Sequence, residues 1–311
     1  VTTIREDIQD ALASISPTET IFMSTIGTRN VDNTFFEWAE VDLAAASTSN
    51  RVIEGEAAPG NDAGTNAVRK GNYTQISDKV VEVSATAEAV NGVGDAQTVA
   101  EQVAYKLKEI KRDMEAMLLS NVAASAGASG TARQTAGLPA FLTTNVSRGT
   151  GGANGTTSGA GSAGFPNAAA TDASAGNMRA VTEALLKSVI KDCWDSGAEP
   201  SVVLCGSAQK QTISAFTGNA TRYKEAEDAK LMAAIDVYVS DFGEVQIVPA
   251  RHVRSRDVFV LDPNYASVAY LQTAKQEPLA KTGHSERRLI SVEYGLQVTS
   301  EKAHGVVADI S

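Results

Sequence analysis

The chain has 311 residues, of which 43% are hydrophobic and 5% aromatic, and its formal net charge is −10. This hydrophobic share excludes a chain that is disordered throughout. A strongly acidic chain repels phosphate backbones, so nucleic-acid binding would need a local basic patch. The longest apolar runs are far below the roughly 18 residues of a membrane helix, and the polar start 1–10 lacks the apolar centre of a signal peptide. We therefore expect a soluble protein that is intracellular when made.

The first part of the chain predicts an arm followed by a long hairpin. Apolar residues at helical spacing over Ile4–Ile15, stopped by Ser16-Pro17, indicate one weak helix in the arm. Alternation of period two then predicts strands at 35–43 and 81–89. Between them, Ser47–Gly71 is rich in turn residues and has almost nothing to bury, which indicates a long hairpin with a turn-rich tip. A loop of this length is either functional or a loose surface excursion.

The strongest periodic signal lies at Asp95–Val122. Apolar residues repeat there at steps of three and four, and Asp95 is an N-cap candidate. At 1.5 Å per residue, such a helix would be about 42 Å long. The apolar stripe fits a coiled-coil dimer or the protein's own sheet, and the sheet is favoured because only about four heptads are available. The opposite face is expected to be solvated and carries Glu101, Lys108, Glu109, Arg112 and Glu115.

The second half predicts a glycine-rich excursion and then a compact lobe. Residues Gly149–Gly164 hold seven glycines in sixteen positions, which is typical of a mobile segment. A phosphate-binding loop is disfavoured there, because the segment has no lysine and no helix begins at its end. The order helix, strand, helix, strand across 178–250 indicates an α/β lobe. Further strands are predicted at 266–271, 289–293 and 296–300, and we expect them to rejoin the long helix.

Motifs typical of enzymes are missing from the sequence. It contains no phosphate-binding loop, nucleophile elbow, zinc-protease helix or calcium loop. The three histidines are isolated from other ligand residues, so we expect no metal, no cofactor and no enzymatic activity. Cys193 and Cys205 are expected to be buried free thiols. A disfavoured alternative is a metabolic α/β enzyme whose site would combine Asp192, Asp236 and His252.

Charged residues in two regions are candidates for contacts between subunits. The predicted hairpin has an acidic tip and a basic stem, which suits an oppositely patterned neighbour. Residues 251–256 contain three arginines, whose forks pair well with carboxylate or phosphate, although a solvated turn is the plainer interpretation. The candidates are Arg51, Glu54, Glu56, Asp62, Arg69, Lys70, Arg251, Arg254 and Arg256.

Taken in order, these parts resemble the major capsid proteins of tailed bacteriophages with the Hong Kong 97-type fold, an α+β fold. The sequence is most similar to the major head proteins of the SU-ten type, and the likeness spans nearly the whole chain. The stretches that carry it are Ser16–Met23, Glu37-Trp38, Gly71–Ser77, Glu109–Glu115, Ala136–Ala140, Leu279–Gly283 and Ala303–Gly305.

The resemblance implies a division of the chain into five parts. In this plan A-domains meet at the axes of hexamers and pentamers, and E-loops overlap adjacent subunits. A small-residue core and an unburied loop agree with it, since such a loop becomes useful when it orders on a neighbour. The parts are an N-terminal arm (1–33), an E-loop β-hairpin (34–91), a P-domain (92–176) with spine helix 95–122 and glycine-rich excursion 149–164, an α/β A-domain (177–256), and strands returning to the P-domain (257–311).

The resemblance also implies a location and partners. The protein would form the icosahedral virion capsid, assembled in the host bacterial cytoplasm, and would enclose double-stranded DNA without sequence-specific binding. A portal would be a further partner, scaffold and decoration proteins are additional candidates, and no membrane is expected. The net charge of −10 fits an inner face that does not hold DNA tightly.

Two alternatives accompany the resemblance. An encapsulin-like nanocompartment shares the fold but would need a cargo-peptide groove, to which nothing in the sequence points. Some capsids of this fold are cross-linked by a Lys–Asn isopeptide bond, for which Lys70 is a candidate. The acidic partner that such a bond needs cannot be placed from the sequence, so we expect non-covalent contacts.

Overall fold

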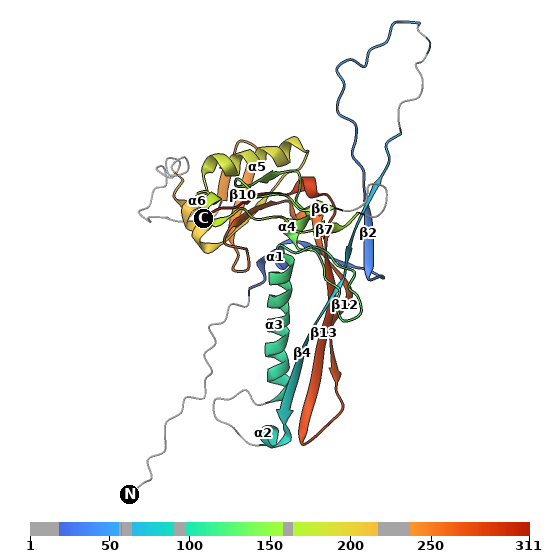
Figure 1. Cartoon of the computed structure of the whole chain (residues 1–311), viewed down its shortest axis with the longest axis vertical. Helices are drawn as coiled ribbons and strands as arrows, with labels where there is room; N and C mark the ends of the chain where they lie inside the picture. Colours follow the sequence, from blue (N-terminus) through green and yellow to red (C-terminus); the bar gives the residue numbers. More distant parts are fainter. Residues whose placement is uncertain (1–18, 56, 58–63, 90–97, 158–163, 217–236) are drawn as a thin grey trace.

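The computed structural model describes residues 19–55, 57, 64–89, 98–157, 164–216 and 237–311. These residues form an elongated α+β molecule (Figure 1). A long helix lies along a narrow sheet at one end, a broader sheet with two helices forms a lobe at the other, and a ribbon projects from the junction. No helix in the described ranges is both long and apolar enough to cross a membrane.

The narrow sheet has four strands in the order β1–β12–β13–β4. β1 runs parallel to β12, and the other two pairings are antiparallel. Alternate residues of β4 point to opposite faces, so Val81 and Val83 are buried while Val80 and Glu82 are exposed. The strands are β1 (Gly27–Asn30), β4 (Gln75–Ser84), β12 (Ala266–Pro278) and β13 (Ser285–Val298).

The predicted long helix is observed as α3 (Val99–Leu118). Its N-cap is Thr98, which accepts a hydrogen bond from the backbone N–H of Glu101, and residues 95–97 lie outside the described ranges. The prediction that this helix extends to residue 122 was wrong. The Asn121 side chain exchanges two hydrogen bonds with the backbone of Ala170, at 2.6 and 3.0 Å, and so directs the chain away from the helical path.

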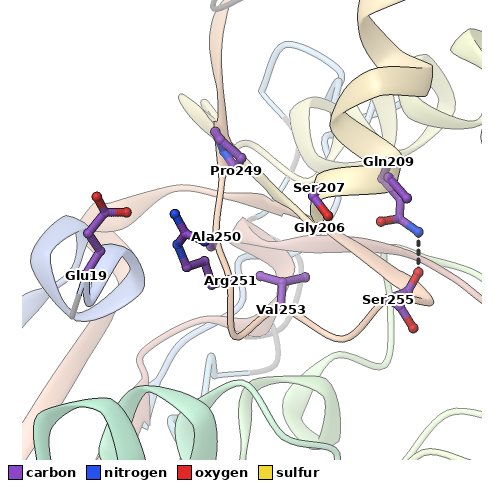
Figure 2. Close-up of a pocket in the computed structure, with 10 residues that line it drawn as sticks. Glu19, Gly206, Ser207, Gln209, Pro249, Ala250, Arg251, Val253 and Ser255 are labelled. Atoms are coloured by element: carbon purple, nitrogen blue, oxygen red, sulfur yellow. Dashed lines mark hydrogen bonds between the residues drawn. The ribbon is translucent and has the colours of Figure 1, made fainter. Parts of the chain in front are cut away.

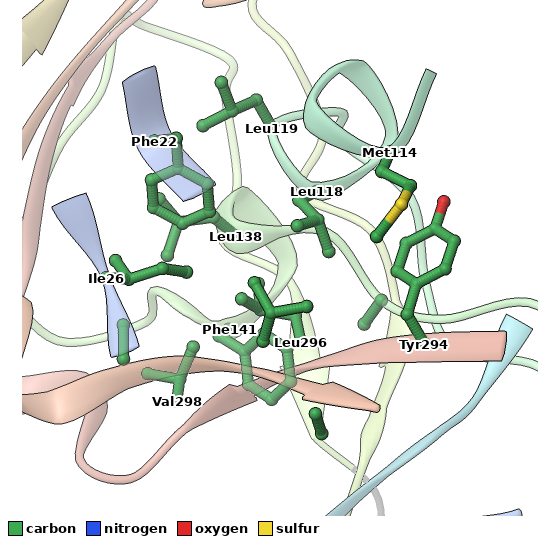
Figure 3. Close-up of a cluster of buried hydrophobic side chains, with 14 of the residues drawn as sticks. Phe22, Ile26, Met114, Leu118, Leu119, Leu138, Phe141, Tyr294, Leu296 and Val298 are labelled. Atoms are coloured by element: carbon green, nitrogen blue, oxygen red, sulfur yellow. The ribbon is translucent and has the colours of Figure 1, made fainter. Parts of the chain in front are cut away.

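The apolar stripe of α3 packs on the protein's own sheet, as expected. Met114 and Leu118 join the buried cluster that also contains Tyr294 and Leu296 of β13 (Figure 3). The same cluster includes Phe22 from α1 (Ile21–Thr25) and residues of α4 (Leu138–Phe141). This cluster therefore joins segments that are far apart in the sequence.

The ribbon differs from the predicted hairpin in its second strand. β2 (Phe35–Glu40) pairs antiparallel with β3 (Val68–Tyr73), not with 81–89. Residues 81–84 instead belong to β4, which pairs with β13, and Ala85–Ala89 form the short helix α2. Alternation predicts that a segment is a strand, but the partner strand depends on which apolar faces meet.

The broader sheet has six strands in the order β5–β14–β11–β8–β10–β9. Both of its faces are buried: Val202 and Leu204 of β8 belong to the cluster shared with α3, whereas Val203 and Cys205 belong to a second cluster under α5. The strands are β5 (Val146–Ser147), β8 (Val202–Cys205), β9 (Val237–Ser240), β10 (Gly243–Pro249), β11 (Asp257–Leu261) and β14 (Gly305–Ala308). The helices are α5 (Glu183–Asp195) and α6 (Ser207–Ser214).

The strands after residue 256 divide between the two sheets. β12 and β13 form the middle of the narrow sheet, whereas β11 and β14 pair within the broader one. Residues 257–311 were predicted to return to the P-domain as a unit, and of their strands β12 and β13 lie in the sheet beside α3 while β11 and β14 do not. The remaining pieces are a small pair of strands, β6 (Thr156–Thr157) and β7 (Pro166–Ala168), and 3-10 turns at Ala175–Asn177, Pro263–Tyr265 and Glu301–Ala303.

Candidate inter-subunit interface

The segment between β2 and β3 extends away from the rest of the molecule (Figure 1). Its described residues are almost all exposed, including apolar side chains that a monomer would normally bury. Leu43 is 83% exposed and Val52 is 71% exposed. The predicted contact residues Arg51 and Glu54 are exposed on the same segment, whereas Glu56 and Asp62 lie outside the described ranges.

The stem of this segment is held by contacts within the chain. Arg69 forms an ion pair with Glu37, and Lys70 forms one with Glu40. These two predicted contact residues are therefore engaged with the neighbouring strand of their own subunit. Lys70 lies beside an acid, but both belong to one ribbon, so no cross-link to a neighbour follows from this geometry.

Aromatic side chains attach the glycine-rich segment to the ribbon. The ring of Phe165 packs edge-on against Tyr73 and Phe35, with centroid separations of 5.3 and 6.0 Å. Next to it, Gly164 donates to the carbonyl of Arg69 at 3.0 Å and accepts from Gly71 at 2.7 Å. One end of the glycine-rich segment is thus hydrogen-bonded to the edge of β3 that does not pair with β2.

The other end of the glycine-rich segment is closely packed, contrary to the expectation of a mobile excursion. A Cβ atom at Gly152 would lie 2.4 Å from Oδ2 of Asp309, and one at Gly155 would lie 2.7 Å from the carbonyl oxygen of Ala168. Glycine is needed at these positions for close approach rather than for flexibility. Residues 158–163 lie outside the described ranges.

A buried asparagine fixes the base of the ribbon. Asn72 donates to the Thr135 hydroxyl at 2.9 Å and to the Leu296 carbonyl at 2.7 Å. Its amide oxygen accepts from the backbone N–H groups of Tyr73 and Ala136, at 2.8 and 3.1 Å. All the hydrogen-bonding capacity of this side chain is used, so it connects β3 to β13 and to residues 135–136. The sequence singled out Gly71–Ser77 only through resemblance.

The arginine cluster at 251–256 divides into two kinds of site. Arg254 pairs with Asp172 and, at 2.9 Å, with Asp257, while Arg256 lies 3.2 Å from Asp172. These arginines are committed within the chain, where they connect the segment after β7 to the start of β11. Arg251 is exposed and lines an open cavity of about 610 Å³ together with Glu19 and the first residues of α6 (Figure 2).

The acids of this cluster were missed at the sequence level. Burial raises the pKa of Asp257 to about 6, with Arg254 opposing the shift. Asp309 is fully buried at φ 58°, and its carboxylate accepts from the backbone N–H groups of Ala173 and Gly149 at 2.8 and 3.2 Å. Asp257 lies only three residues from Arg254, so its pairing was visible in the sequence, whereas the contacts of the arginines with Asp172 and Asp309 join distant parts of the chain and leave no local signal.

A second missed residue is Glu115, which was wrongly placed on the solvated face of α3. Its side chain is buried and accepts from the backbone N–H groups of Phe22 and Met23, at 2.7 and 2.9 Å. Burial raises the pKa of Glu115, and the two backbone hydrogen bonds oppose the shift. The carboxylate satisfies free N–H groups in the first turn of α1 and so fixes the described start of the chain to α3.

Of the residues considered for a catalytic site, Asp192 is half-buried on α5. His252 is half-buried in the turn after β10, His304 is fully buried, and Asp236 lies outside the described ranges. Burial lowers the pKa of His304 to about 4 and raises those of Cys193 and Cys205 to about 12 and about 11. Both cysteines are free and buried, as expected. Among the described residues, no group of three or more His, Cys, Asp or Glu could hold a metal ion.

Solved structures of capsids and of an encapsulin share this fold along nearly the whole chain. The capsid of cyanophage P-SCSP1u has a TM-score of 0.62 with 12% identity, covering 98% of this chain and 93% of that one. The phage G gp27 major capsid protein, solved with gp26 decoration proteins, gives 0.56 with 10% identity over 99% and 96%. The SrpI encapsulin of Synechococcus elongatus PCC 7942 gives 0.56 with 12% identity over 97% and 93%. The fold is therefore that of the Hong Kong 97-type capsid proteins.

Sequence comparison narrows this class to one family. The family model described as SU10 major capsid protein matches residues 1–311, so the chain belongs to that family. The major capsid protein of Escherichia phage Phieco32 is 37% identical over 112 residues, which is 36% of this chain and 32% of that relative. The chain thus belongs to a family of phage major capsid proteins, which are structural components of the virion, and the match spans about a third of the length of this curated relative.

Proposed function

We propose that copies of this chain assemble into the closed icosahedral shell that encloses the phage DNA, as hexamers and pentamers. The main support for this proposal comes from the segment after β2. Its side chains Leu43 and Val52 are exposed and pack against no part of the described chain's core. Burying such side chains on an adjacent copy would supply favourable free energy that the monomer leaves unused.

In this proposal the ribbon β2–β3 with its distal segment is the E-loop, and α3 with the narrow sheet is the P-domain. The broader sheet with α5 and α6 is the A-domain, and residues 1–33 form the arm. Ion pairs and hydrogen bonds at Glu37, Glu40 and Asn72 support the E-loop assignment, because they hold the stem rigid while the distal segment stays free to reach a neighbour.

Partners beyond the chain itself belong to the same proposal. A portal would occupy one vertex, packaged double-stranded DNA would fill the interior without sequence-specific contacts, and decoration proteins are further candidates, since phage G carries them. Contacts between copies would be non-covalent, because Lys70 pairs with Glu40 of its own ribbon.

Deletion of Ala57–Thr65 tests the proposal. The shortened chain should remain folded and soluble, because the described part of this segment makes few contacts with the body, but it should no longer close shells. Circular dichroism and size-exclusion chromatography would report folding, and negative-stain electron microscopy would report shells. Normal shells from the deletion variant, or a wild-type chain that stays monomeric at high concentration, would contradict the proposal.

A further inference from the structure

The solvent-facing ridge of α3 carries basic side chains without acidic partners. Lys108 and Lys111 are exposed and Arg112 is half-buried. In the described part of the chain none of the three forms an ion pair, and the Lys108 ammonium lies 5.9 Å from the ring centre of Tyr105. At 1.5 Å per residue, the three side chains leave the helix within about 6 Å along its axis.

The acids of α3 are engaged in other contacts. Asp113 lies 2.7 Å from Lys79 of β4, and Glu109 pairs at 2.9 Å with Lys106. Glu115 is buried against α1, and Glu101 accepts from the hydroxyl of its own N-cap residue at 2.7 Å. Contacts within the helix and with β4 and α1 therefore engage these acids, whereas Lys108, Lys111 and Arg112 have no ion pair among the described residues.

Further positive charge comes from the turn after β10. Arg251 is exposed there and has no ion-pair partner among the described residues. Figure 2 shows α3 passing beside this turn. The pKa of the adjacent His252 is lowered first by burial and then by the positive charge of Arg112, with Asp113 opposing and Arg251 adding to the shift. Arg251 of the turn and Arg112 of the ridge thus both act on His252, so their charges lie near one another.

The opposite face of the narrow sheet has a different character. Even-numbered residues of β4 point away from α3, and they include exposed Ile76 and Asp78. On that face Glu82 is paired with Arg287 at 3.4 Å, and Glu293 is paired with Arg133. Lys275 of β12 also lies on that face and has no ion pair among the described residues, but Lys108, Lys111 and Arg112 are the closer group, since they follow one another within five positions of α3.

We propose that the α3 ridge, formed by Lys108, Lys111 and Arg112 with Arg251 beside it, faces the interior of the shell and contacts phosphates of the packaged duplex DNA. The inference rests on the proposed function, and it revises the expectation from net charge that the inner face does not hold DNA tightly. Arginine and lysine on an open ridge suit phosphate oxygens without reading base sequence. A local basic patch is sufficient for this contact although the whole chain is acidic. At 0.1 M salt, the repulsion between a phosphate and an acidic side chain is largely screened beyond about 10 Å.

The test compares two charge reversals of equal size. The ridge variant is Lys108→Glu with Lys111→Glu, and the control is Lys275→Glu with Lys281→Glu, two exposed lysines on the β12–β13 hairpin. Fluorescence anisotropy would measure binding of the unassembled full chain to a short labelled duplex of mixed sequence, from about 50 to 200 mM salt. Negative-stain microscopy of each protein would report shell formation separately.

We expect the ridge variant to bind duplex DNA at least about tenfold more weakly than the control at the lowest salt. Loss of two phosphate contacts should also reduce the slope of log K against log salt by about 1.8. Equal weakening in both variants, or wild-type binding by a ridge variant that forms shells, would overturn the inference. A ridge variant that binds DNA normally but forms no shells would also overturn it and would assign the ridge to an acidic protein partner. Absence of shells from the wild-type chain would instead contradict the proposed function.

Discussion

The broader sheet buries apolar side chains on both of its faces, whereas the segment after β2 leaves side chains of the same kind in solvent. Leu204 and Phe259 are fully buried, and Leu43 is 83% exposed. The first region obtains its packing from one chain, and the second can obtain it only from another molecule. A capsid subunit needs both kinds of region. It must fold before it assembles, and it must leave apolar surface exposed that becomes buried only on contact with a neighbouring subunit.

The largest effect is expected from a cavity in the broader sheet. Phe259→Ala in β11 removes a fully buried ring from the cluster shared with α3, so the free energy of unfolding should fall by about 3–5 kcal/mol. Denaturant unfolding of the unassembled chain would measure it. If the free energy of unfolding fell by less than about 1 kcal/mol, the broader sheet would not be the folding core. Its contrast with the exposed segment after β2 would then be wrong.

A somewhat smaller effect is expected from Asp257 through pH. Because its folded pKa is about 6 against an ordinary value of 3.8, ionisation disfavours the folded state, and this residue's contribution to stability falls as pH rises between those values. At about 1.4 kcal/mol per pKa unit, the change is about 3 kcal/mol. Asp257→Asn should therefore gain stability relative to wild type between pH 4 and pH 7.

Unfolding at both pH values would measure this gain. Asp241→Asn, in the exposed turn between β9 and β10, is the matched control and should follow the wild-type profile. Parallel profiles for the wild type and the Asp257 variant would contradict the assignment of a buried titrating carboxyl group.

The smallest effect on folding is expected in the distal segment. Replacing both Leu43 and Val52 with Ser should change the free energy of unfolding by less than about 0.5 kcal/mol, since both side chains are exposed. The same variant should form fewer shells, as measured by light scattering and electron microscopy. Ser47→Ala with Ser49→Ala, exposed polar positions on the same segment, should assemble normally. A double Ser variant that assembles like wild type would remove the apolar contact from the proposed interface.

Local periodicity by itself determined several parts of this protein. Steps of three and four predicted α3, alternation predicted that 35–40 and 81–84 are extended, and the lack of anything to bury predicted the projecting segment. These features depend on neighbours within a few residues, so the sequence displays them directly. Resemblance to a family added the order of the parts, which periodicity could not supply.

Tertiary structure decided which elements meet and what the charges do. Pairing of β4 with β13, burial of Glu115 under α1, and the contacts of Arg254 with Asp172 join residues 82 to 219 positions apart. Net charge alone could show only that a nucleic-acid contact would need a local basic patch, and the contacts of the acids of α3 decide where such a patch lies. Long-range contacts have no period in the sequence, because the chain brings such residues together only when the apolar faces of its elements pack.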